Sequence, residues 1–329
     1  PIARTPLRPC QDVCPRALGG QIVENELGLW AIPIAIIGGA IRVSTPFLFV
    51  SLGEVLTERS GRINLGLEGT LVFGAMAGYG IAVETGSPWI GVFGAAVAGA
   101  LFGVVHGVLC SMQRVNDIAI GIALMLLGLG LAFFFGKPYI QPGALDLPSI
   151  SFGWWSDIPQ VQAALKVNIL FLAGIVAAIG LWWMFRATRV GLLIRVVGDS
   201  TDAARAMGLR PSLIRTLATA AGGALAGVGG AYLSLFYPGS WNEGISSGQG
   251  LMAVALVIFA RWNPIACFWA ALLFGGAGAL GPALQSIGVS EGYYLFFAAP
   301  YVLTLGVLIM TSSPSRAMVG APGELSITK

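Results

Sequence analysis

Long hydrophobic runs separated by short polar breaks dominate this chain. The apolar segments occupy roughly 28–57, 65–84, 88–112, 117–136, 166–186, 212–237, 248–262, 264–286 and 292–312. A helix needs about 20 apolar residues to cross a bilayer core about 30 Å thick, and most of these runs approach that length. The pattern therefore predicts an all-α fold, a polytopic membrane helical bundle of about eight to ten transmembrane helices.

The first apolar segment is longer than one span requires. It carries Arg42, Ser44 and Pro46 near its middle, so it is either one kinked helix or two short ones. A charge in hydrocarbon is costly, and Arg42 is therefore expected near an interface or paired with Glu54 or Glu58.

Composition agrees with a membrane protein. The chain has 329 residues, of which 56% are hydrophobic and 10% are charged, whereas soluble domains carry about 25% charged residues. The 47 glycines suit close approach of membrane helices. A net charge of +3, spread over many loops, indicates no nucleic-acid partner. The four cysteines lack zinc-site spacing and are expected to be free thiols.

Lysine and arginine concentrate in cytoplasmic loops of membrane proteins, and this rule orients the chain. Six arginines lie between residues 186 and 215, so the loop 187–211 is predicted to be cytoplasmic. Counting spans then places the loop 137–165 outside. The predicted organisation is a polar N-terminal tail at 1–27, whose side is left open, a membrane domain at 28–312, and a cytoplasmic C-terminal tail at 313–329.

Two polar, glycine-rich stretches interrupt the apolar pattern. SGRINLGLEG covers 60–69 and PGSWNEGISSGQG covers 238–250, and each precedes a new apolar run. Broken segments in corresponding positions of two halves point to a transporter's binding site, so we interpret them as two broken-helix pseudo-repeats. The alternative is that both are ordinary turns at the membrane surface. The residues predicted to border a substrate path are Asn64, Glu68, Gly69, Trp241, Asn242, Glu243 and Gln249.

Trp241 has two interpretations at this stage. Its indole could stack on a flat ring of the solute, or it could anchor a helix in the aromatic belt at the membrane surface, which is slightly favoured.

The cytoplasmic loop contains the features of a short exposed helix. Asp199, Ser200 or Thr201 can cap its start, and Gly208 can end it. We expect this helix to dock a partner protein; the alternative is an amphipathic helix at the headgroups, with Arg195 and Arg205 binding lipid phosphate. The residues predicted to form the docking surface are Gly198, Asp199, Asp202, Ala203, Ala204, Met207 and Gly208.

Three stretches of the chain carry a family resemblance. They are ERSGRINLGLEG, GLLIRVVGDSTDAARAMGL, and GQGLMAVALVIFARWNP followed by AALLFGG. In order and spacing they resemble motifs of the inner-membrane permeases of ABC importers, in the sugar, nucleoside and branched-chain amino acid group. INLGLEGT is most similar to the nucleoside, purine-like branch. The resemblance covers roughly residues 40–325, and the tail 1–27 has no counterpart in it.

This resemblance implies a multi-pass protein of the bacterial inner (plasma) membrane that takes part in an import cycle with several partners. A periplasmic or lipid-anchored solute-binding protein would deliver a small polar solute, either nucleoside-like or a simple sugar. A second permease subunit, often a non-identical paralogue, would enclose the path, and an ABC ATPase subunit would dock under the cytoplasmic loop. ATP and Mg²⁺ would bind that ATPase, with no cofactor in this chain, which has no GxxxxGK[ST] loop.

A secondary transporter or channel is the alternative function. Such a protein would work without an ATPase and would couple transport to H⁺ or Na⁺ through buried carboxylates. It would not need a docking loop. An enzyme is not expected, because the chain has one histidine and neither an HExxH nor a GxSxG motif.

Overall fold

The computed structural model describes residues 31–112, 115–140, 146–152, 154, 161–162, 165–286, 295–296, 298–311 and 320–327. The helices of this part are α1 (Ala31–Arg59), α2 (Leu67–Thr85), α3 (Pro88–Leu109), α4 (Asp117–Gly136), α6 (Ile169–Ala187), α7 (Arg189–Asp199), α8 (Thr201–Ala206), α9 (Pro211–Leu235), α10 (Gln249–Phe259), α11 (Pro264–Ser286), α13 (Ala299–Thr311) and α14 (Gly323–Ile327). A 3₁₀ turn, η2 (Lys137–Tyr139), follows α4. Each predicted apolar run contains one of the long helices or the shorter α10 and α13, which confirms the helical bundle.

Six helices of the described residues are long and apolar enough to cross a membrane. They span Ile36–Arg59, Pro88–Leu109, Asp117–Tyr139, Ile169–Ala187, Pro211–Leu235 and Pro264–Gln285. The helix α10 is apolar but has only 11 residues, roughly half the length that a bilayer crossing needs.

The first apolar run is one continuous helix, α1, with Pro46 inside it. Of the two possibilities, one kinked helix or two short ones, the structure therefore has a single helix. The suggested pairing of Arg42 with Glu54 or Glu58 is wrong, because 12 residues of helix separate Arg42 from Glu54 by roughly 18 Å. Glu54 bonds instead to Asn64 of the first break, and Glu58 bonds to Trp262 just beyond α10, as described below.

A small β ribbon departs from the all-α prediction. Strand β1 (Ser149–Ser151) pairs antiparallel with β2 (Lys166–Asn168). The apolar run predicted at 166–186 therefore begins as a strand, and α6 starts only at Ile169. The side chain of Asn168 marks that start, because its Oδ1 accepts a hydrogen bond from the Leu170 amide at 2.8 Å.

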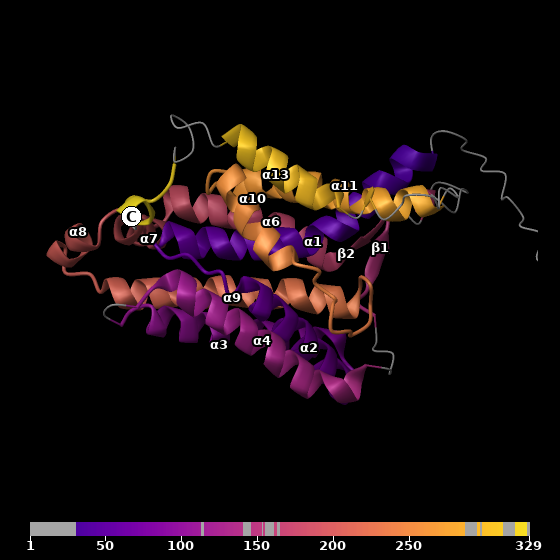
Figure 1. Ribbon diagram of the computed structural model, residues 1–329, viewed down its shortest axis with the longest axis horizontal. Helices are drawn as coiled ribbons and strands as arrows, with labels where there is room; N and C mark the ends of the chain where they lie inside the picture. The colour runs from indigo at the N-terminus through magenta and orange to yellow at the C-terminus, as the bar shows by residue number, and fades with distance from the viewer. Residues whose placement is uncertain are drawn as a thin grey trace, which may run out of the picture.

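The central helix of the bundle is α9. It packs against α1, α2 and α3, and in Figure 1 it lies between α1 and the group formed by α2, α3 and α4. Glycines allow this approach: a Cβ on Gly223 would lie 2.2 Å from the Gly99 carbonyl oxygen, and one on Gly222 would lie 2.5 Å from that of Gly53. Small residues thus replace side-chain packing where the helix backbones meet.

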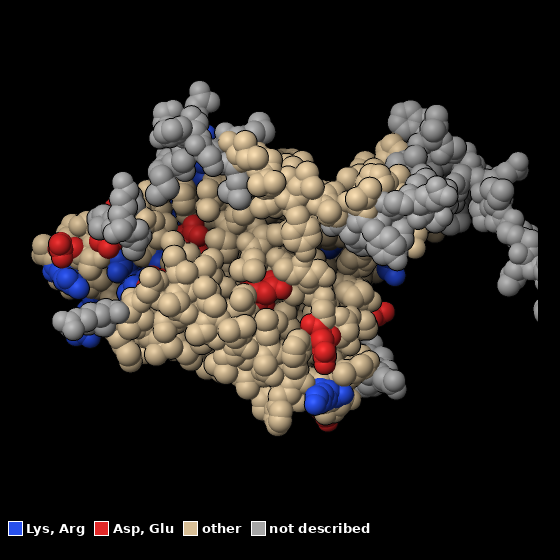
Figure 2. All heavy atoms as spheres, viewed as in Figure 1, with Lys and Arg blue, Asp and Glu red and all other residues tan. Residues whose placement is uncertain are grey.

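The helices run roughly along the long axis of the molecule, with α8 at one end and the β1–β2 ribbon at the other (Figure 1). We call these the α8 end and the ribbon end. On the face shown in Figure 2, charged side chains gather at the α8 end, while most of the middle is uncharged. The tail predicted at 1–27 and residues 313–319 of the C-terminal tail lie outside the described residues.

Candidate functional site

The first break turns back into the bundle instead of staying at its end. Helix α1 ends at Arg59, and Gly61 takes a left-handed conformation with φ of +84°. The Asn64 amide then donates to Glu54 Oε1 at 2.9 Å. Since Glu54 lies five residues before Arg59, roughly 7.5 Å along the helix, α2 begins inside the bundle.

The second break brings α10 to the same depth. The chain leaves α9 at Leu235 and enters α10 at Gln249, with Gly248 as the N-cap residue at φ of +79°. At the other end of α10, the indole of Trp262 donates to the Glu58 carboxylate. Arg59 Nε also donates to the Trp262 carbonyl oxygen at 3.0 Å. The 11 residues of α10 therefore run from the end of α1 inward by roughly 16 Å.

Glu68 joins the two breaks. Its Oε1 accepts hydrogen bonds from Ser246 Oγ at 2.5 Å and from the Gly248 amide at 3.0 Å. Its Oε2 accepts one from the Gly250 amide at 2.6 Å. We call these four residues the Glu68 junction. A Cβ on Gly250 would lie 2.6 Å from Glu68 Cα, so the close approach requires glycine there.

The Glu68 junction gives hydrogen-bond partners to buried polar groups that would be costly without them. Glu68 is only 7% exposed. A carboxylate buried at membrane depth costs about 2.5–3.5 kcal/mol or more. Hydrogen bonds to a charged group contribute about 1.5–3 kcal/mol each. The amides of Gly248 and Gly250 are among the first-turn donors of α10, which lack partners within the helix. Glu68 therefore caps α10 from another helix.

Three other predicted path residues lie inside this subunit. Asn64 and Trp241 are each 2% exposed. Asn64 Oδ1 accepts from the Gly66 amide at 2.9 Å, which shapes the first break. Gly69 lets α4 approach α2, because a Cβ there would lie 2.6 Å from the Met125 carbonyl oxygen. Trp241 packs against Gly136, so the structure buries its ring and does not support the aromatic-belt interpretation.

The remaining predicted path residues are accessible or lack a partner. Asn242 and Glu243 are exposed in the second break. Gln249, the first residue of α10, is partly buried, and its Oε1 has no hydrogen-bond partner among the described residues. The structure thus separates the predicted set into residues that are buried within the breaks and residues that are exposed or only partly buried. That the two breaks are repeats of one another is not confirmed.

The predicted docking helix is α8. Of the three candidate caps, Ser200 is the one used: its Oγ accepts from the Ala203 amide at 3.2 Å. The helix ends as predicted before Gly208, which has φ of +76°. Asp199, Asp202, Ala203, Met207 and Gly208 are exposed.

Gly198 and Ala204 are buried, by contrast with the other residues of the predicted docking surface. A Cβ on Gly198 would lie 2.1 Å from the Arg59 carbonyl oxygen. These two residues therefore attach the loop to its own subunit.

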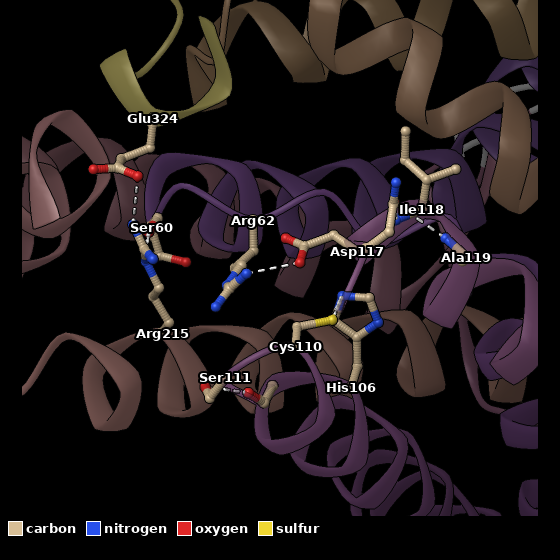
Figure 3. A network of polar contacts seen from close by, with 12 residues as sticks. Ser60, Arg62, His106, Cys110, Ser111, Asp117, Ile118, Ala119, Arg215 and Glu324 are labelled. Carbon is tan, nitrogen blue, oxygen red and sulfur yellow. Dashed lines mark hydrogen bonds and ion pairs between the residues drawn. The ribbon is translucent and has the colours of Figure 1, made fainter. Parts of the chain in front are cut away.

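Arg215 connects α8 to the rest of the bundle. This residue of α9 is 7% exposed. Its Nε donates to the Ser60 carbonyl oxygen at 2.9 Å, and its Nη2 donates to Thr201 Oγ1 at 2.8 Å and to the Val197 carbonyl oxygen at 3.1 Å. Nη2 also lies 3.5 Å from Glu324 Oε2 (Figure 3). We call these five residues the Arg215 cluster.

Sequence reasoning missed the roles of Arg215 and Glu324. A signal existed for Arg215, because it is a charged residue inside a predicted apolar span, where charges are functional by default. No comparable signal marks Glu324, which lies in a short polar tail.

A second ion pair lies beside the Arg215 cluster. Arg62 Nη1 is 2.7 Å from Asp117 Oδ1, which ties the first break to the start of α4 (Figure 3). Asn116 caps α4, because its Oδ1 accepts a hydrogen bond from the Ile118 amide at 2.8 Å. A cavity of about 460 Å³ is lined by residues of both ion pairs, Arg62, Asp117, Arg215 and Glu324.

The chain matches known proteins over most of its length. Residues 26–311 match the family described as branched-chain amino acid transport system / permease component. A protein of Haloferax volcanii named "Putative glucose ABC transporter permease protein" is 34% identical, over 78% of this chain and 79% of its own. The nucleoside ABC transporter permease protein of Lactococcus lactis is 31% identical, over 84% and 91%. The guanosine ABC transporter permease protein of Bacillus subtilis is 29% identical, over 86% and 92%.

The Glu68 junction predicts different effects for two glutamates that are equivalent in the sequence pattern. Replacing Glu68 with Gln turns one acceptor into an NH₂ group that faces an amide or hydroxyl donor. We expect this change to lower the free energy of unfolding by about 1.5–3 kcal/mol, the scale of a hydrogen bond to a charged group. The measurement is the thermal unfolding midpoint of the purified protein in lipid nanodiscs.

Glu243→Gln is the matched control for stability, because Glu243 is exposed in the same break that Glu68 binds. Its midpoint should equal that of the unmodified protein. Equal midpoints for Glu68→Gln and Glu243→Gln would show that the junction does not hold the two breaks together.

Proposed function

Because the chain belongs to the family of branched-chain amino acid transport system permease components, it is a membrane-embedded permease subunit of an ABC importer, and we propose that it translocates a nucleoside or a simple sugar. The family match over residues 26–311 carries the assignment as a permease subunit, and the names of the relatives support the solute class. In the proposed cycle a separate binding protein delivers the solute, and a separate ATPase supplies the energy. ATP and Mg²⁺ bind the ATPase and not this chain.

We propose that the ATPase docks on the exposed face of α8. Support comes from the exposure of Asp202, Ala203 and Met207, the last of which is 63% exposed. The same short helix is held by buried contacts on its inner side, through Ala204. An exposed apolar methionine on an anchored helix is suited to enter a cleft of a partner protein.

The α8 end is proposed to face the cytoplasm in the plasma membrane. Arginines of the loop 187–211 support this orientation through the positive-inside rule. Glu324 of α14 contacts Thr201 of α8, so the C-terminal segment lies at the same end and would share its side. Strand β1, a described part of the loop 137–165, lies at the ribbon end, so we propose that this loop faces the binding protein.

The solute path is proposed to run along the second break, between this chain and a second permease subunit, which is a non-identical paralogue. Asn242, Glu243 and Gln249 would contact the solute, since their polar atoms are exposed or lack partners among the described residues. Asn64, Glu68, Gly69 and Trp241 would form the wall behind them. A secondary transporter is disfavoured, because that class has no use for a docking helix such as α8.

The solute class is proposed from the relatives. Two of them are named for nucleosides or guanosine and one for glucose, and these solutes share a ring bearing several hydroxyl groups. Exposed amide and carboxylate side chains in the second break are suitable partners for such hydroxyls.

Docking on α8 predicts that a charge on its outer face prevents assembly. Ala203→Arg adds a long cation at an exposed position and should abolish co-purification of the ATPase and ATP-driven uptake, while the protein remains folded. Ala204 is unsuitable for this test, because it is 0% exposed and Arg there would disrupt the loop itself. The measurement is affinity co-purification of the ATPase subunit with the tagged permease.

Thr85→Arg provides the control, since Thr85 is exposed at the far end of α2. It should leave co-purification unchanged. Normal ATPase binding by the Ala203→Arg protein would place the docking surface elsewhere.

The proposed solute class predicts which compounds compete for uptake. In proteoliposomes that contain the complete importer, unlabelled guanosine should reduce ATP-dependent uptake of labelled nucleoside strongly. Glucose is the second candidate, and leucine should not compete. If only amino acids or lipids competed for uptake, the proposed nucleoside or sugar solute would be wrong, and the assignment to the permease family would still hold.

A further inference from the structure

The C-terminal segment of the described chain, residues 320–327, lies directly against the end of α7 and the start of α8. Ala321 and Leu325 pack on the hydrophobic cluster that contains Phe185, Ile194 and Trp262. A Cβ on Gly323 would lie 2.4 Å from the Asp199 carbonyl oxygen, so the start of α14 touches the end of α7.

Glu324 holds the first turn of α8. Its Oε1 accepts a hydrogen bond from the Thr201 amide at 2.6 Å. The first amides of a helix have no partners within the helix, and Ser200 satisfies only that of Ala203. Glu324 therefore supplies the missing acceptor from a segment 123 residues further along the chain.

The charge of Glu324 is part of this contact. Partial burial alone would raise its pKa, but the hydrogen bonds from Thr201 and the positive charge of Arg215 outweigh burial and hold the pKa of Glu324 below its ordinary value. The carboxyl group is therefore ionised at neutral pH. Its contribution is lost only as the pH falls through that lowered pKa.

A six-residue helix cannot be rigid by itself. Isolated helices shorter than about 12–15 residues are marginal in water, and α8 has six. Its stiffness must come from its anchors, which are the buried Ala204 and the Arg215 cluster. Through Arg215, these anchors join α8 to α9 and to the Ser60 carbonyl of the first break.

We propose that Arg215 and Glu324 are positioning residues that transmit motion of α8 to α9 and to the first break. The inference rests on the proposed function, because it assumes an ATPase docked on α8. Glu324 acts after docking: it keeps α8 from bending under load, so that displacement of α8 moves the backbone at Ser60. Movement there reaches the Glu68 junction through the first break. Without this contact the ATPase would still bind and hydrolyse ATP, but less of that work would move solute.

The experiment uses the complete importer in proteoliposomes and measures solute molecules taken up per ATP hydrolysed. Glu324→Ala removes both contacts of the carboxylate, Glu324→Gln keeps an acceptor for Thr201 without the charge, and Glu324→Asp keeps the charge on a shorter side chain. Glu84→Gln, at the far end of α2, is the control for the same chemical change in an exposed residue.

Glu324→Ala should assemble with the ATPase and hydrolyse ATP normally while uptake per ATP falls about three- to tenfold, the scale of one ordinary hydrogen bond at a site that solvent partly reaches. Uptake per ATP should fall less in Glu324→Gln than in Glu324→Ala, and Glu324→Asp should recover part of the loss. Uptake per ATP in Glu84→Gln should equal that of the unmodified importer. Hydrogen exchange of the α8 peptide should rise in Glu324→Ala.

Unchanged uptake per ATP would overturn the inference, and so would loss of the ATPase from the Glu324→Ala complex, because either result means that Glu324 does not act after docking. Failure of the proposed function looks different, since the unmodified protein would then show no ATP-driven uptake. Hydrogen exchange of the α8 peptide does not depend on ATP. Unchanged hydrogen exchange in Glu324→Ala would therefore refute the claim that Glu324 stabilises α8, whatever the function.

Discussion

One buried carboxylate determines how the two halves of this chain meet. Glu68 lies on α2, and the groups that it binds lie 178 to 182 residues later, at Ser246, Gly248 and Gly250. Backbone amides at membrane depth must find partners within the protein, because hydrocarbon offers none. A helix that begins inside the bundle, as α10 does, leaves such amides at its start. The carboxylate and the amides thus satisfy one another, and neither break would be stable at that depth alone.

The ends of α10 explain how distant parts of the subunit can move together. Its start is bound to α2 through Glu68, and its other end is bound to α1 through the contacts of Trp262 with Glu58 and Arg59. The first break lies between these points and is fixed to α1 through Glu54. At the α8 end, Arg215 contacts the same break through the Ser60 carbonyl. A displacement at α8 can therefore reach the depth at which the two breaks meet through the hydrogen bonds of Arg215 and the backbone of the first break.

Much of this arrangement could be predicted from the sequence. Long apolar runs located most of the helices to within a few residues, because hydrocarbon tolerates few polar interruptions, and the glycine-rich breaks stood out for the same reason. A cap at Ser200 was among the three that local chemistry allowed. Pairings across long separations could not be predicted: the pattern treats Glu68 and Glu243 alike, although one is buried and the other exposed. Nor does it show that residues 149–151 and 166–168 form a ribbon, or that Glu324 reaches Thr201.

A double-mutant cycle on Glu68 and Ser246 tests the central interaction most directly. The free energy of unfolding would be measured for the unmodified protein, for Glu68→Gln, for Ser246→Ala and for the protein with both changes. Two residues in direct contact do not contribute independently, so the two losses should sum to more than the loss in the double variant, with a coupling energy of about 0.5–3 kcal/mol. Strictly additive losses would mean that the two residues do not interact, and that other contacts hold the two breaks together.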